Sequence, residues 1–78
     1  MKNIDLADVA IHIHEMPGHL ARGQIENRLR NLPGVVSATS HDKTPHLVVV
    51  EYNPAEINNQ AILACVKEQG LHAELIGL

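Results

Sequence analysis

The spacing of apolar residues changes several times along this chain, and the order of these changes restricts the fold more than any other sequence feature. Val9, Ile11 and Ile13 alternate with polar or small residues, which is the pattern of a half-buried strand. Ile25 and Leu29 then recur at the spacing of one helix face. The full pattern predicts strand, helix, strand, strand, helix and strand over 9–14, 19–31, 35–40, 47–52, 58–69 and 71–76.

Turn-forming residues separate these segments. Pro17-Gly18 ends the first strand and Pro33-Gly34 ends the first helix. The polar segment 41–45 is predicted to connect two strands as a hairpin. Asn58 is expected to cap the start of the second helix, and Gly70 to end it.

This order of elements predicts an α+β fold. If each helix makes a right-handed crossover, the result is a ferredoxin-like βαββαβ sandwich, with a four-stranded antiparallel sheet and two helices on one face. We expect a single domain over 1–78 with its core at about 9–76.

Composition excludes several classes of function. One Tyr, no Phe and no Trp leave little for stacking on bases, and six basic against nine acidic residues argue against nucleic-acid binding. No apolar run approaches the ~20 residues that cross a bilayer, so we expect no membrane insertion. The amino terminus lacks the apolar core of a signal peptide, which predicts a cytoplasmic protein. We also find no nucleophile with a nearby base and no phosphate-binding Gly-rich loop, so the chain is not expected to be an enzyme.

Several stretches, in order and in register, resemble one family over nearly the whole chain. They are Ile11-His12-Ile13-His14-Glu15-Met16, Leu32-Pro33-Gly34-Val35, Tyr52-Asn53-Pro54 and 62–71. Together they resemble the heavy-metal-associated domain of copper chaperones and metal-transporting P-type ATPases. The resemblance implies that Met16 packs beneath the loop that follows the first strand.

The chain departs from that family at the residues that bind metal. Gly18 and Ala21 stand where the family has the two cysteines of its Cys-x-x-Cys motif. Neither residue offers a ligand, whereas thiolates are what bind Cu(I) in a linear or trigonal geometry. Copper transfer by thiolate exchange is therefore not expected here.

Histidine is unusually frequent, with six in the chain, and the topology predicts that all six lie in one half of the domain. Strand alternation directs His12, His14 and His72 to the helix-free face of the sheet, with His19 nearby. Imidazoles that converge in this way suit Zn(II), Cu(II) or Ni(II). Our first hypothesis is a non-enzymatic protein that binds a metal through these histidines for sensing, buffering or delivery. A haem is a further option for an imidazole pair beside apolar residues.

Other interpretations of the same residues stay open at this stage. His12, His14 and His72 would also serve as ordinary polar residues of a solvated face, and His41 and His46 as polar residues of the hairpin. The domain would then have lost metal binding and kept its scaffold as a protein-interaction or dimerisation module. A third hypothesis is a small-ligand regulatory domain of the ACT type, which shares the topology.

Two surfaces are candidates for binding a protein partner. Leu47, Val49 and Ile76 are predicted to lie on the helix-free face, where exposed aliphatic side chains suggest a covered surface and a homodimer or partner. Arg22 and Arg28 are expected on the solvated face of the first helix, where they would also form a docking patch for an acidic partner.

Overall fold

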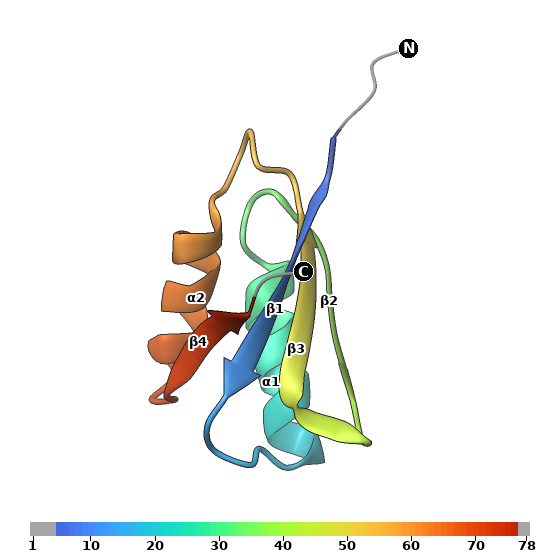
Figure 1. The fold of residues 1–78 in the computed structure, drawn as a ribbon, viewed down its shortest axis with the longest axis vertical. Coiled ribbons are helices and arrows are strands. Elements are labelled where there is room, and N and C mark those ends of the chain that lie inside the picture. Colours follow the sequence, from blue (N-terminus) through green and yellow to red (C-terminus); the bar gives the residue numbers. More distant parts are fainter. Residues whose placement is uncertain (1–4, 77–78) are drawn as a thin grey trace.

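The computed structural model describes residues 5–76 and confirms the predicted order of elements. The chain forms β1 (Ala7–Ile13), α1 (His19–Arg30), β2 (Val35–His41), β3 (Thr44–Tyr52), α2 (Asn59–Lys67) and β4 (Ala73–Ile76). The strands make one antiparallel sheet in the order β2-β3-β1-β4, and both helices pack on one side of it (Figure 1). This is the ferredoxin-like sandwich. No helix in the described range is long and apolar enough to cross a membrane.

Three of the boundaries that differ from the sequence prediction lie at the histidine-rich end of the sheet. β3 begins at Thr44, so the supposed connection 41–45 is mostly strand, and only Asp42 and Lys43 turn the chain. β4 begins at Ala73, which leaves His72 in the turn before it. β1 ends at Ile13, so His14 lies just beyond the strand. In each case backbone pairing with a neighbouring strand, which periodicity does not report, sets the boundary.

The core fills the space between the sheet and the helices. Alternate residues of the central strands, including Ile11, Ile13, Val48 and Val50, are fully buried against Leu29, Ile62 and Val66 of the helices. Asn58 caps α2 as predicted, and its side chain accepts a hydrogen bond from the Ala61 amide at 2.9 Å. The β1–α1 loop, the β2–β3 hairpin and the start of β4 meet at one end of the sheet, the lower end in Figure 1. The histidines flank these three connections.

Replacing Gly34 with Ala should lower the free energy of unfolding by about 2–4 kcal/mol. Gly34 has a φ of +93°, and an added Cβ would lie 2.9 Å from both Glu56 Cβ and Ile57 Cγ2. Gly70 has a similar φ of +83° with open space around it, so Gly70→Ala is the matched control. The control should cost only about 1–2 kcal/mol, the backbone part of the effect. Urea denaturation measures both, and equal losses would contradict the role given to the crowding at Gly34.

Candidate metal site on the helix-free face of the sheet

Strand pairing brings two histidines and one glutamate together at the histidine-rich end. His12 lies on β1 directly opposite Glu74 of β4 in the register, and both side chains point away from the helices because Ile11, Ile13 and Leu75 point toward them. His14 lies two residues further along the same face. The main-chain amide of His14 donates to the His72 carbonyl at 2.8 Å, which extends the contact between β1 and β4 past the strand end.

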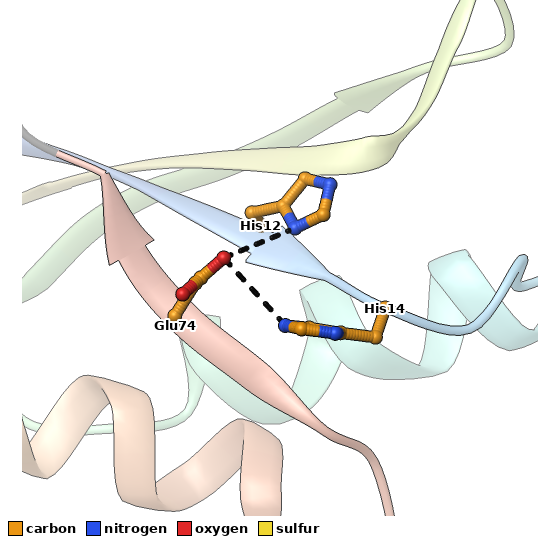
Figure 2. A group of neighbouring side chains, drawn as sticks. All are labelled: His12, His14 and Glu74. Atoms are coloured by element: carbon orange, nitrogen blue, oxygen red, sulfur yellow. Dashed lines mark ion pairs between the residues drawn. The ribbon is translucent and has the colours of Figure 1, made fainter.

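The three side chains converge on one carboxylate oxygen. His12 Nδ1 lies 3.7 Å from Glu74 Oε1, and His14 Nε2 lies 3.6 Å from the same atom (Figure 2). One donor atom from each residue lies within 4.8 Å of the other two. The two imidazole rings meet edge to face, with centroids 5.4 Å apart. We call His12, His14 and Glu74 the open-face cluster.

These separations match a small cation better than direct hydrogen bonds. Ligand atoms bound ~2.0–2.1 Å from a tetrahedral ion lie ~3.4 Å apart. Both nitrogen–oxygen distances exceed the range of a good hydrogen bond, and both are within a few tenths of an ångström of that ligand–ligand spacing. The two ring nitrogens lie within 4.8 Å of one another, so the side chains would have to move closer together for all three donors to hold one ion.

His12 is the member that needs a partner most. Its Nδ1 atom is buried, yet finds no hydrogen-bond partner within the described residues. A buried polar atom left unpaired costs free energy, typically ~1–3 kcal/mol. The His46 ring packs beside the His12 ring, with centroids 5.8 Å apart. The His46 Nδ1 lies 3.0 Å from the Ile13 carbonyl oxygen and 2.9 Å from that of Glu15. Because carbonyl oxygens only accept hydrogen bonds, His46 Nδ1 carries the proton and donates to them. These hydrogen bonds hold the His46 ring in place next to His12.

His72, a predicted ligand, has a different partner. Its Nδ1 donates to Glu15 Oε2 at 2.7 Å, and its main-chain amide donates to Glu15 Oε1 at 2.9 Å. The hydrogen bonds from His72 are the main cause that lowers the pKa of Glu15 to about 2. His72 is therefore engaged with Glu15, beside the open-face cluster and outside it.

His19, the fourth predicted ligand, lies on the opposite side of the same end. Its Nδ1 is 3.5 Å from Asp42 Oδ1, in the β2–β3 turn. Hydrogen bonding from His19 and then from Arg22 holds the pKa of Asp42 below its usual range. The arrangement is an ion-pair cluster that ties α1 to the hairpin, and the structure does not bring His19 to His12 or His14.

The expectation that Arg22 lies on a solvated helix face is wrong. Arg22 is only 6% exposed, and its guanidinium donates to the His41 carbonyl and pairs with the Asp42 carboxylate. Its aliphatic stem covers the edge of the core, and its charge is matched by the turn. Arg28 is exposed on α1, beside a shallow groove shared with Gln24 and Glu68. Of the two arginines, only Arg28 is accessible to a partner.

The loop that carries the family's metal motif holds no comparable donor set. Gly18 and Ala21 are both exposed at the start of α1, and neither has a ligand atom. Met16 was expected beneath this loop, but it is 72% exposed, and Pro17 occupies the buried position instead. The residues present do not fit a soft metal held by thiolates.

A haem also lacks support, because His12 and His14 both turn a nitrogen toward Glu74 rather than toward the two faces of a ring.

The aliphatic residues predicted on the helix-free face do lie there. Val49 is 40% exposed and Ile76 is 41% exposed, while Leu47 is half-buried. In the register Ala10 pairs with both Val49 and Ile76, and His12 pairs with both Leu47 and Glu74. An apolar row thus runs across the sheet next to the row that holds the open-face cluster.

Sequence reasoning missed two residues of this site. Glu74 follows from the same alternation that places His72 and Ile76, but a carboxylate in a strand is usually a solvated charge, so the histidine pattern alone does not predict it as a ligand. His46 was assigned to the hairpin as a polar residue. Its place beside His12 depends on Pro45 and His46 being part of β3, which the sequence pattern does not indicate.

Comparisons with known proteins identify the fold. No protein-family model and no curated protein matches the chain. Among solved structures it is similar to a copper-binding domain from HMA7, a P-type ATPase, with 18% identity, a TM-score of 0.81 and coverage of 90% of this chain and 93% of that one. The N-terminal soluble domains of Bacillus subtilis CopA give 27% identity and a TM-score of 0.81, with coverage of 91% and 48%. The CopZ metallochaperone is 18% identical with a TM-score of 0.76, and the match covers 90% of this chain and 100% of that one. The chain has the fold of heavy-metal-associated domains of copper chaperones and P-type ATPases, and its single cysteine leaves it without their Cys-x-x-Cys motif.

Proposed function

We propose that this domain binds a divalent transition-metal ion through His12 Nδ1, His14 Nε2 and the Glu74 carboxylate. The observation that carries the proposal is the buried, unpaired His12 Nδ1, which faces a second imidazole and a carboxylate at ion-sized spacing. Imidazole and carboxylate ligands favour Zn(II), Cu(II) or Ni(II) over Cu(I). The expected ion is therefore a divalent one, in contrast to the Cu(I) that a pair of thiolates binds.

The exposure of the cluster supports sensing, buffering or delivery rather than catalysis. His14 and Glu74 are more than half exposed, so an ion held by three protein donors would keep a coordination position open to solvent. Such an ion exchanges readily with another ligand, which suits a carrier, and an open sheet face offers a substrate no enclosed pocket. We place this activity in the cytoplasm.

A residue-resolved titration tests the proposal. Metal-free, tag-free protein is titrated with Zn(II) while the imidazole nitrogen and backbone amide resonances are followed. We expect saturable shifts at the ring nitrogens of His12 and His14, while His19 and His41 stay unchanged. Weak, unsaturable shifts spread over all six histidines would overturn the proposal and favour a protein-interaction module that has lost metal binding.

A further inference from the structure

We infer that the helix-free face is the contact surface of a metal-dependent homodimer, in which a second copy of this chain closes the coordination shell of the bound ion. The inference rests on the proposed function, because the ion is what joins the copies. Three features support it: the number of protein donors, the size and composition of the face, and its charge.

The open-face cluster is incomplete by itself. Zn(II) in a closed site takes four ligands, and the cluster supplies three from one side of the ion. Both His14 and Glu74 project outward from the sheet, so the open coordination position faces whatever covers the face. A two-fold axis at the histidine-rich end sets two clusters opposite one another, and the second carboxylate oxygen of each Glu74 can then bind the ion of the other copy as its fourth ligand.

The face carries one aliphatic row and is small. Val49, Ala10 and Ile76 form an aliphatic row next to the cluster, with Leu47 beside His12. Four strands ~4.8 Å apart and about seven residues long give a flat area of roughly 400 Å² per copy. A stable interface buries ~800 Å² of accessible surface per partner around an apolar centre, and the aliphatic row of this face contributes only Val49 and Ile76 as exposed side chains, so apolar contact alone is too little to hold two copies together without the ion.

Charge makes the association depend on the metal. Glu74 lies beside the proposed two-fold axis, and Asp8 lies opposite Glu51 in the strand register further along the same face. Each chain also carries a net charge of −3. Two metal-free copies that approach by this face therefore bring like charges together, and a cation between the two Glu74 carboxylates removes the repulsion where it is strongest.

The mass of the full chain in solution tests the inference. Light scattering coupled to size exclusion should give the monomer mass with a chelator present and the dimer mass with saturating Zn(II). Val49→Asp should still bind Zn(II) yet keep the monomer mass, and Ile76→Asp should behave in the same way. Leu20→Asp places the same change on the exposed start of α1, away from the sheet, and should dimerise like the wild type.

The outcomes separate this inference from the proposed function. A saturable Zn(II) site with a monomer mass throughout would overturn the dimer and leave the metal site in place. A Zn(II)-dependent dimer that Leu20→Asp blocks, while Val49→Asp and Ile76→Asp do not, would assign the contact to another surface and overturn the inference. No Zn(II) binding in the titration would remove the proposed function and the dimer with it.

Discussion

Replacing His14 with Ala should lower the Zn(II) affinity of the domain by about 100-fold or more, which corresponds to ~3 kcal/mol. The imidazole is one of three donors, and a divalent ion left with two protein ligands on an exposed sheet gains little over water. Glu74→Gln should have an effect of similar size, because it keeps the shape of the side chain and removes the only negative charge of the cluster. Competition with a chromophoric chelator at fixed pH measures both affinities.

His72→Gln is the matched control for these variants. His72 is an exposed histidine at the same end of the sheet, but its Nδ1 is bonded to Glu15 and it lies outside the cluster. We expect its Zn(II) affinity to stay within about threefold of the wild type. If His72→Gln weakens binding as much as His14→Ala does, the ion is held by a different set of histidines and the assignment of Glu74 is wrong.

The fold could be predicted because each element carries a local signal that agrees with the tertiary structure. Alternation in β1 and β3 matches the burial of Ile11, Val48 and Val50, and Gly34 and Gly70, which lie in the turns after the two helices, both have a positive φ. With six elements in a fixed order, the right-handed crossover rule leaves few topologies. The register between strands then follows from which face is buried.

The site could be predicted only in part, because side-chain partners depend on contacts that periodicity does not describe. Alternation placed His12 correctly, but it could not tell that His72 bonds to Glu15 or that His19 bonds to Asp42. Arg22 was misplaced for a related reason. A helix face that looks solvated in sequence becomes buried when the β2–β3 turn folds over it and supplies a carboxylate.

Restoring the two missing cysteines should give the domain a Cu(I) site that it now lacks. In the double variant Gly18→Cys/Ala21→Cys, we expect the Cu(I) affinity to rise by about a thousandfold or more, ~4 kcal/mol. An added Cβ at Gly18 meets nothing within 4 Å, and the φ of −71° there suits any residue. Side chains three apart at a helix start lie on one face, and the helix N-terminus stabilises thiolates. Competition with a Cu(I)-specific chelator measures the gain.

The double variant also tests whether metal binding at the loop positions 18 and 21 is independent of the open-face cluster. Gly18→Ser/Ala21→Ser is its control, since it adds side chains of the same size without a soft ligand, and it should leave the Cu(I) affinity unchanged. Adding His12→Ala to the cysteine variant should leave the gain in Cu(I) affinity unchanged, because the loop and the sheet face offer separate donors. If the cysteines fail to raise the Cu(I) affinity, the loop conformation itself does not suit a soft metal. The exposed Met16 and the buried Pro17 would then be part of that difference. If they succeed, the loop presents a geometry that suits a soft metal, and the donor atoms at positions 18 and 21 alone decide whether Cu(I) binds there.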